Sequence, residues 1–291
     1  MTDATAGKNS PPASQAGSNE TIEALAQLIQ HNQPVTAVTG AGISASSGLP
    51  VYRDAGGNWI HSAPVQGPDF RASEKIRQRY WCRSYFGWQS FSSATPNDAH
   101  KDLALLEKNK LIKTVITQNV DGLHQTAGSE STVALHGNLS EVICLNCGDI
   151  SLRADLQHRL QKNNPEFLKI EFEVAPDGDA IVDDAHIEQF NTVACTACGG
   201  VLQPYVVFYG DSVPKLRVQH CMQQLKESRL LLCIGTSLMV YSSFRFCKAA
   251  ADADIPVVIV NNGITRADDL ASLKFNGDCT GALRQLKQLL L

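Results

Sequence analysis

Two cysteine pairs have the spacing of a metal-binding knuckle. Cys144 and Cys147 form one Cys-x-x-Cys pair, Cys195 and Cys198 form the other, and glycine follows each pair. Two intervening residues let one tight turn aim both sulfurs at a single point, and glycine frees the backbone amides to approach them. Four thiolates in tetrahedral geometry suit a structural Zn²⁺ without an open coordination position. We therefore predict one scaffolding zinc ion.

Other interpretations of these cysteines remain open. The spacer from 148 to 194 is longer than the ~15–20 residues of a compact zinc ribbon, so it must hold folded structure. Incidental core thiols are one alternative, and a redox site is another, although neither pair opens a helix after a strand. Nine cysteines could also indicate a secreted disulfide scaffold. No secretory signal pattern begins the chain, so we expect a reducing compartment and metal-bound thiols.

A glycine-rich turn follows a short apolar run. Residues 40–45 read Gly-Ala-Gly-Ile-Ser-Ala and match the Gly-x-Gly-x-x-(Gly/Ala) pattern directly after the run at 35–39. In such a turn, backbone amides and a helix N-terminus meet a pyrophosphate. A plain strand-to-helix turn is the alternative, because the acidic residue that dehydrogenases place about 20 positions later is missing. A dinucleotide bound here would not bind in the ordinary dehydrogenase way.

Alternating strands and helices must position these groups. Apolar, β-branched runs predict strands buried on both faces at 35–39, 111–117, 206–208, 230–234 and 257–260. Helical periodicity starts at Ile22, and further helices are predicted over 72–89, 96–109, 213–227 and 242–251. This alternation is typical of a parallel sheet covered on both sides. We predict an α/β fold with a Rossmann-like parallel sheet.

Two stretches break the alternation and predict a smaller inserted lobe. Residues 55–91 carry all three tryptophans, and residues 141–203 hold both cysteine pairs. The Rossmann-like domain would then comprise 21–54, 92–140 and 204–291. Residues 1–20 contain too little apolar surface to offset the entropy of ordering, which predicts a disordered tail.

Composition disfavours several functional classes. The 291 residues are 43% hydrophobic and 19% charged, the balance of a globular protein. The net charge of −4 disfavours duplex nucleic acid as the main ligand. The apolar runs are far shorter than the ~20 residues that span a bilayer. We expect a cytoplasmic protein without membrane or nucleic-acid partners, and a monomer is compatible with the sequence.

The motifs after the glycine turn carry a specific family resemblance. They read GAGISASSGLPVYRD from 40, TQNVDGLH from 117, LHG from 135 and GTSLMV from 235. In this order the set strongly resembles the sirtuins, the NAD-dependent protein-lysine deacylases, and the match covers 22–291. RYWCR from 79 and VVFYGD from 206 narrow the resemblance to the class II branch. Tyr209 departs from the family's usual Phe, and the missing mitochondrial presequence favours a bacterial-type protein.

The resemblance implies a role in NAD binding for each matching residue. The pyrophosphate and the nicotinamide ribose would be held by Gly40, Ala41, Gly42, Ile43 and Ser44. The loop that closes over NAD would contain Tyr52 and Arg53. The pocket for the carboxamide and the ribose hydroxyls would be lined by Gln118, Asn119, Val120 and Asp121. The phosphate and adenosine side would be bound by Gly235, Thr236, Ser237, Asn261, Asn262, Gly263 and Cys279.

The implied chemistry needs few catalytic groups. Nicotinamide in NAD is already a cationic leaving group, so a dry pocket that twists it away exposes the ribose carbon to the amide oxygen of an acyl-lysine. A base must then deprotonate a ribose hydroxyl, which suits an imidazole. We expect His136 to be this base and Asn119 to assist catalysis. A structural role for His136 is the alternative, and His124 is the competing histidine, expected instead to brace its loop.

Substrate recognition is expected in the cleft between the lobes. The peptide backbone would pair with the strand that carries Val206, Phe208 and Gly210, a mode that tolerates many sequences. Tyr80 and Arg83 lie three residues apart on a predicted helix, so both can face one pocket. There Arg83 could pair with an acidic acyl group, as in the similar Tyr-x-x-Arg pair of some sirtuins. A solvated Arg83 is the alternative.

Three other activities share parts of this pattern. A protein mono-ADP-ribosyltransferase would use the same NAD site, and the sequence does not separate it from a deacylase. A non-catalytic zinc-dependent binding module is disfavoured by the acidic balance and by the lack of basic clusters around the cysteine pairs. A hydride-transferring oxidoreductase is disfavoured by the missing acidic ribose ligand.

Overall fold

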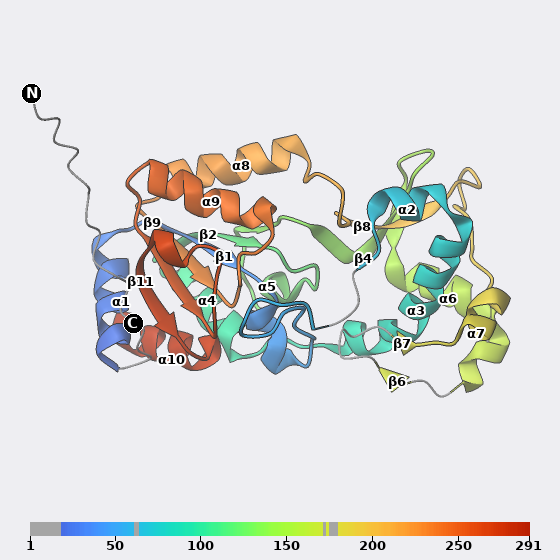
Figure 1. Cartoon of the computed structure of the whole chain (residues 1–291), viewed down its shortest axis with the longest axis horizontal. Coiled ribbons are helices and arrows are strands. Elements are labelled where there is room, and N and C mark those ends of the chain that lie inside the picture. Colours follow the sequence, from blue (N-terminus) through green and yellow to red (C-terminus); the bar gives the residue numbers. More distant parts are fainter. Residues whose placement is uncertain (1–18, 61–63, 171–172, 175–179) are drawn as a thin grey trace, which may run out of the picture.

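The chain forms two lobes that lie side by side along its long axis (Figure 1). The computed structural model describes residues 19–60, 64–170, 173–174 and 180–291. The predicted tail lies outside this range except for its last two residues, which belong to helix α1 (Asn19–His31). One lobe surrounds a parallel sheet, and the other consists of helices and short antiparallel strands.

The large lobe is built on a six-stranded parallel sheet, which confirms the predicted α/β class. The strand order is β11-β10-β9-β1-β2-β3, and every neighbouring pair is parallel. The strands are β1 (Val35–Thr39), β2 (Ile112–Thr117), β3 (Thr132–Ala134), β9 (Leu230–Ile234), β10 (Val257–Asn261) and β11 (Ala271–Asn276). The three central strands β1, β9 and β10 are buried along their whole length, because helices cover both faces.

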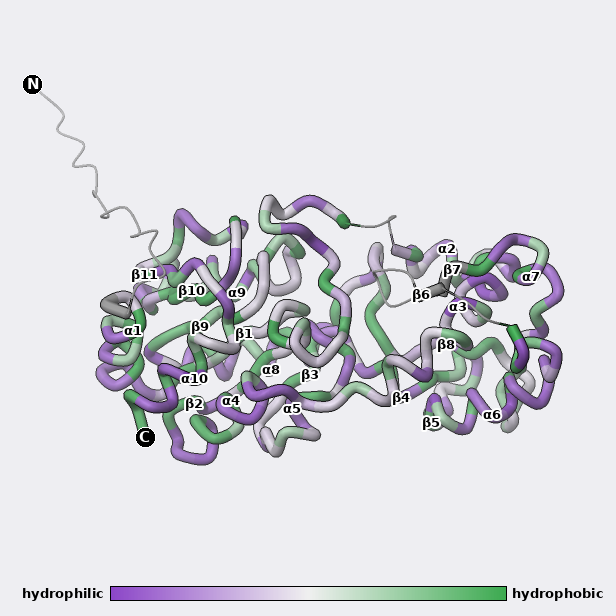
Figure 2. The backbone as a smooth tube through the Cα atoms, turned by 90° about the horizontal axis from the view of Figure 1, so that it is seen from below, coloured by the Kyte–Doolittle hydropathy of each residue, from purple (hydrophilic) through white to green (hydrophobic). Residues whose placement is uncertain are grey.

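Helices cover the two faces of this sheet separately (Figure 1). Helices α1, α4 (Asp98–Lys108) and α10 (Cys279–Leu290) pack on one face, and α8 (Lys215–Lys226) and α9 (Tyr241–Asp252) pack on the other. The sheet strands carry hydrophobic segments, whereas the covering helices alternate between hydrophilic and hydrophobic residues (Figure 2). Helix α4 begins two residues later than predicted, since Asn97 caps it by accepting from the backbone N–H groups of Ala99 and His100.

The small lobe combines helices with a three-stranded antiparallel sheet in the order β5-β4-β8. Its strands are β4 (Gly137–Cys144), β5 (Ile150–Leu152) and β8 (Leu202–Val206), and separately β6 (Glu173–Val174) pairs antiparallel with β7 (Ala180–Ile181). Its helices are α2 (Gly67–Ala72), α3 (Glu74–Ser93), α6 (Arg153–Asn163), the short η2 (Pro165–Lys169) and α7 (Asp184–Gln189). The predicted division into two lobes would cut α3, β4 and β8 internally, and that division stays a prediction.

Two further predicted elements differ from the structure, one in its strand partner and one in its start. The run at 206–208 was expected to be a buried strand of the parallel sheet, but β8 ends at Val206 and pairs antiparallel with β4. A three-residue apolar run does not specify its partner strand, and here the neighbouring β4 provides it. The helix expected over 72–89 is two helices, because Ser73 adopts an extended backbone and its side chain accepts from the N–H of Ile76. None of the described helices is long and apolar enough to cross a membrane.

Candidate active site

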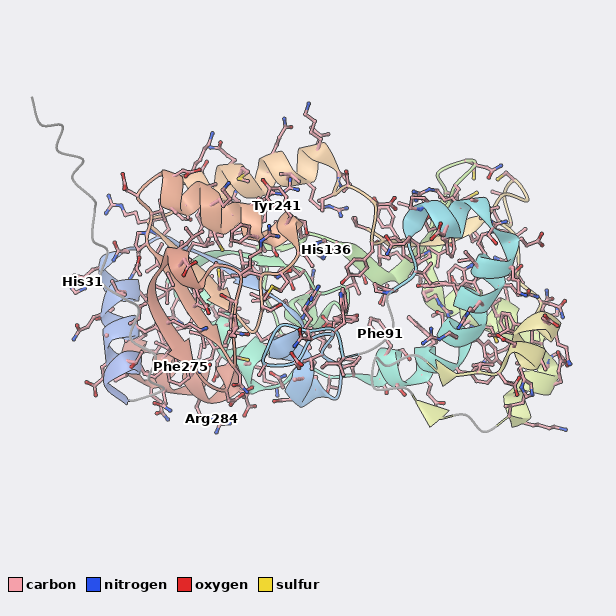
Figure 3. All side chains as sticks on the ribbon, viewed as in Figure 1. His31, Phe91, His136, Tyr241, Phe275 and Arg284 are labelled. Atoms are coloured by element: carbon pink, nitrogen blue, oxygen red, sulfur yellow. The ribbon has the colours of Figure 1, made fainter. Side chains whose placement is uncertain are left out.

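A cavity of about 1200 Å³ lies between the two lobes, at the carboxyl ends of β1 and β9. From β1 the chain continues to β2 and β3 on one side, and from β9 it continues to β10 and β11 on the other. The strand order therefore reverses between β1 and β9, which is where open α/β sheets bind ligands. In Figure 3, His136 lies between the sheet and the small lobe.

Most residues predicted to contact NAD line this one cavity. They are Gly40, Ala41, Gly42, Ser44, Tyr52, Arg53, Gln118, Asn119, Val120, Asp121, Gly235, Thr236, Ser237, Asn261, Asn262 and Cys279. The lining also includes His136 and the predicted substrate residues Tyr80, Arg83, Val206, Phe208 and Gly210. Two predicted residues lie elsewhere: Ile43 is fully buried in the core of the large lobe, and Gly263 packs against the backbone of Ala55.

The turns after β1 and β9 pack directly against each other. The N–H of Gly42 donates to the backbone oxygen of Gly235 over 2.8 Å, and a Cβ atom on Gly42 would lie 2.8 Å from that same oxygen. Gly235 has a φ of +58°, and a Cβ atom there would lie 2.5 Å from the backbone nitrogen of Ile43. Both positions therefore require glycine, and their close packing brings the two turns together at the cavity wall.

Polar side chains at the ends of β1 and β2 form a connected network. Asn119 donates to Ser44 Oγ over 3.0 Å, and Ser44 Oγ donates to the Asp121 carboxylate over 2.7 Å. Gln118 donates to Thr236 Oγ1 over 2.8 Å, which links the ends of β2 and β9. These bonds fix the side chains before any ligand arrives, so the pocket is preorganised for amide and hydroxyl groups.

Two buried histidines lie beneath this network. His124 Nε2 is 2.9 Å from Thr39 Oγ1, and the His124 ring is 4.9 Å from the ring of His100. His100 Nε2 in turn lies 3.3 Å from Ser44 Oγ. Burial lowers the pKa of His100 to about 4 and that of His124 to about 3, so both rings are neutral at pH 7. His124 is fully buried and outside the cavity lining, as expected for a residue that braces its loop.

His136 is held at both ring nitrogens at the edge of the cavity. Nδ1 lies 3.0 Å from the backbone oxygen of Gln118, and Nε2 lies 2.8 Å from Ser242 Oγ. A carbonyl oxygen only accepts, so Nδ1 carries the proton and Nε2 presents its lone pair. Burial lowers the pKa of His136 to about 4, and the charge of Arg217 acts in the same direction. The ring is therefore a neutral base at pH 7.

The small lobe supplies the opposite wall of the cavity. The N–H of Val207 donates to the backbone oxygen of His136 over 2.7 Å, which ties this segment to His136. The Phe208 ring lies 5.5 Å from the Tyr80 ring, edge to face. Tyr80 and Arg83 both line the cavity, in line with their spacing on α3.

Among the cavity residues that were not predicted from the sequence, Ser242 and Arg153 have the most specific contacts. Ser242 contacts His136, and the only signal for it is its place at the start of a predicted helix. Arg153 is 1% exposed, lies 4.7 Å from the Trp88 ring centre and 5.5 Å from that of Trp81, and donates to the backbone oxygen of Ser84. Burial lowers its pKa to about 10. Sequence offers no signal for a buried arginine, because most arginines are exposed.

The four predicted metal ligands meet at one point of the small lobe. Their sulfur atoms all lie within 4.8 Å of one another, with 3.5 Å between Cys144 and Cys198 and 3.9 Å between Cys147 and Cys195. A tetrahedral zinc with ~2.3 Å bonds places its sulfurs ~3.8 Å apart, so the residues fit this ion. All nine cysteines lie in the described part of the chain, and none forms a disulfide.

Comparison with known proteins places the chain in a family. Residues 40–242 match the model of the Sir2 family, and the chain belongs to this family. It is 45% identical over 261 residues to NAD-dependent protein deacetylase 2 of Bradyrhizobium diazoefficiens, covering 90% of this chain and 96% of that relative. It is 44% identical over 269 residues to an NAD-dependent protein deacetylase of Xanthomonas campestris, covering 92% of both chains.

Solved structures agree with this membership. A Sir2 complex with a p53 peptide and NAD⁺ superposes with a TM-score of 0.75 at 28% identity, covering 92% of this chain and 97% of that one. A Sir2 bound to an acetylated peptide gives a TM-score of 0.74 at 27% identity, with the same coverage. The resemblance to the sirtuins is thereby confirmed for the family, and the class II branch stays a prediction.

Proposed function

We propose that the protein is an NAD-dependent protein-lysine deacylase that forms nicotinamide, O-acyl-ADP-ribose and free lysine. The observation that carries this proposal is one cavity at the switch point of the sheet, where the glycine turns, the Asn119–Asp121 network and a neutral His136 meet. The relatives at 44–45% identity are named NAD-dependent protein deacetylases. A protein of similar structure binds NAD⁺ and peptide together.

The residues present fit NAD as the co-substrate. The turns at Gly42 and Gly235 pack too closely for any Cβ atom, and both turns line the cavity, which suits the close approach of a pyrophosphate to the backbone. When bound, NAD supplies an electrophilic ribose carbon with nicotinamide as its leaving group. Asn119, Ser44 and Asp121 would hold the nicotinamide side, and the walls from both lobes would exclude water. Thr236 and Asn261 would face the adenosine side.

His136 acts as the general base in this scheme. Its Nδ1–H stays on the carbonyl of Gln118, and its Nε2 takes the proton of a ribose hydroxyl, so that the oxygen can attack the acyl carbon. General base catalysis by a positioned imidazole contributes about 10²–10⁴-fold. No nucleophile from the protein is needed, because the acyl oxygen of the substrate performs the first attack.

The substrate is an acyl-lysine peptide, which would pair its backbone with the segment from Val206 to Gly210. The acyl end would point toward Tyr80 and Arg83, where a guanidinium favours a carboxylate. Comparing acetyl-lysine with succinyl-lysine and glutaryl-lysine peptides on wild type and Arg83→Ala tests this selectivity. Equal losses on all three peptides would rule out pairing by Arg83.

The proposal also includes the metal site, the cellular compartment and the domain boundaries. The four-cysteine site would hold one Zn²⁺ that stabilises the small lobe and takes no part in the reaction, since its four sulfurs complete the shell. Nine thiols without a disulfide are typical of a reducing compartment, and we propose the cytoplasm. The Rossmann-like domain would comprise 21–54, 92–140 and 204–291, with 55–91 and 141–203 as the small lobe.

Mass spectrometry of an acetyl-lysine peptide, with and without NAD, tests the proposed function. We expect NAD-dependent loss of the acetyl group, with nicotinamide and acetyl-ADP-ribose as products. His136→Ala should reduce this turnover by about 10³-fold without unfolding the protein. Transfer of label from NAD to protein would support an ADP-ribosyltransferase instead, and the absence of any nicotinamide release would support a binding module.

A further inference from the structure

Two adjacent serines at the start of α9 have different partners. Ser243 is fully buried, and its hydroxyl donates to the backbone oxygen of Val240 over 3.0 Å. Ser242 lines the cavity, and its Oγ lies 2.8 Å from His136 Nε2. Among the described residues, the Ser242 side chain has no other hydrogen-bond partner. The hydroxyl of Ser243 therefore supports the helix, and that of Ser242 supports the histidine.

The direction of the Ser242 bond follows from the other ring nitrogen. The carbonyl of Gln118 requires the proton on Nδ1, so Nε2 accepts and the Ser242 hydroxyl donates. Two bonds on opposite sides of the ring fix both its tautomer and its rotation. In Figure 3, His136 lies beneath the start of α9, next to the labelled Tyr241. Because Nδ1 already carries a proton, Nε2 is the ring nitrogen that can accept one. The bond from Ser242 keeps Nε2 at the cavity.

We propose that Ser242 is a positioning residue, whose hydroxyl keeps His136 Nε2 turned toward the cavity until a hydroxyl of the substrate replaces it. This inference rests on the proposed function. In the base step the ribose O–H bond breaks, the proton moves to Nε2, and the electron pair stays on the oxygen that attacks. No proton passes through Ser242, so the loss of its hydroxyl slows this step without abolishing it.

Substitution of Ser242 by threonine or by valine separates the effect of the hydroxyl from the effect of side-chain packing. The two new side chains have the same shape, and only threonine keeps a hydroxyl. Two rates are measured for each variant with an acetyl-lysine peptide: deacetylation, and exchange of labelled nicotinamide into NAD. Exchange requires departure of nicotinamide but no deprotonation of a ribose hydroxyl. We expect Ser242→Thr to stay within about 3-fold of wild type in both rates. Ser242→Val should lose about 10-fold in deacetylation kcat, with exchange within about 2-fold and an unchanged KM for NAD.

Ser243→Ala is the matched control, since it removes a neighbouring hydroxyl that does not contact His136. We expect its ratio of exchange to deacetylation to equal that of wild type. If Ser242→Val does not fold, Ser242→Ala takes its place in the comparison with Ser242→Thr. The inference is wrong if the hydroxyl-free variant loses both rates in proportion, or if it behaves like threonine. If the wild-type protein shows no deacetylation, the proposed function is wrong. Failure of the inference about Ser242 is a different result, because it appears only in the comparison of variants with an active wild type.

Discussion

The two lobes hold themselves together in different ways. The large lobe buries aliphatic side chains on both faces of its sheet, so it has one apolar core cluster on each face. The small lobe packs an aromatic cluster against a three-stranded sheet, whose strand β5 leaves Ile150 and Leu152 50% and 58% exposed. Its four cysteines add a metal site. The cavity wall that carries the glycine turns therefore belongs to the lobe with the larger apolar core, and the opposite wall belongs to the lobe with the four-cysteine site.

Loss of the metal should be the largest difference between the lobes. Cys198→Ala removes one of four ligands, and we expect it to lower the free energy of unfolding by more than about 4 kcal/mol and to abolish deacylation. Urea unfolding and the zinc content of the purified protein measure both effects. The control is Cys221→Ala, a fully buried thiol of the large lobe, which should cost about 1 kcal/mol and leave the zinc content intact. Equal costs for the two variants would contradict the comparison.

The buried arginine of the small lobe should have the next largest effect. Arg153→Ala removes the stacking on Trp81 and Trp88 and the bonds to Ser84, for an expected cost of about 2–4 kcal/mol. Its counterpart is Arg284, which is labelled at the lower edge of the large lobe in Figure 3. Arg284 pairs with Asp98 over 2.8 Å on the surface. Both side chains of that pair are 55% exposed, so Arg284→Ala should cost less than about 1 kcal/mol. Thermal unfolding that ranks the two variants in reverse would contradict this account.

The buried histidines of the large lobe should make the free energy of unfolding depend on pH. Per pH unit, this effect should be smaller than that of losing Arg153 or a cysteine ligand. In the unfolded chain His124 takes up a proton near pH 6.5, whereas in the folded protein burial lowers its pKa to about 3. Stability is therefore full above pH 6.5 and falls as the pH decreases toward 3, by up to about 1.4 kcal/mol per pH unit. His124→Gln should flatten this slope by that amount between pH 6.5 and 5.

The exposed His158 of the small lobe is the control for this slope. His158→Gln makes the same exchange of side chains at an exposed position, so a nonspecific effect of replacing histidine by glutamine would appear in this variant too. Protonation of the cysteine ligands changes the free energy of unfolding of both variants by the same amount. It therefore cancels when the pH dependence of His124→Gln is compared with that of His158→Gln. Identical slopes for wild type and both variants would show that His124 contributes nothing to the acid sensitivity.

The sequence predicts what local pattern determines. The strand at 230–234 has the bounds of β9, since a strand buried on both faces is apolar throughout. The glycine turn and the cysteine pairs follow from backbone and ligand geometry, which short motifs encode. The partner of β8 does not follow, because strand pairing depends on distant residues. The burial of Arg153 does not follow from local pattern either. The same is true of the contact between Ser242 and His136, because these residues lie 106 positions apart in the sequence.

A structure with both NAD and an acetyl-lysine peptide bound tests the central claim most directly. We expect His136 Nε2 within about 3 Å of a ribose hydroxyl and the acyl oxygen beside the glycosidic carbon. The nicotinamide should lie among Asn119, Ser44 and Asp121. A dinucleotide seated with that carbon beyond the reach of both His136 and the acyl-lysine would contradict the account.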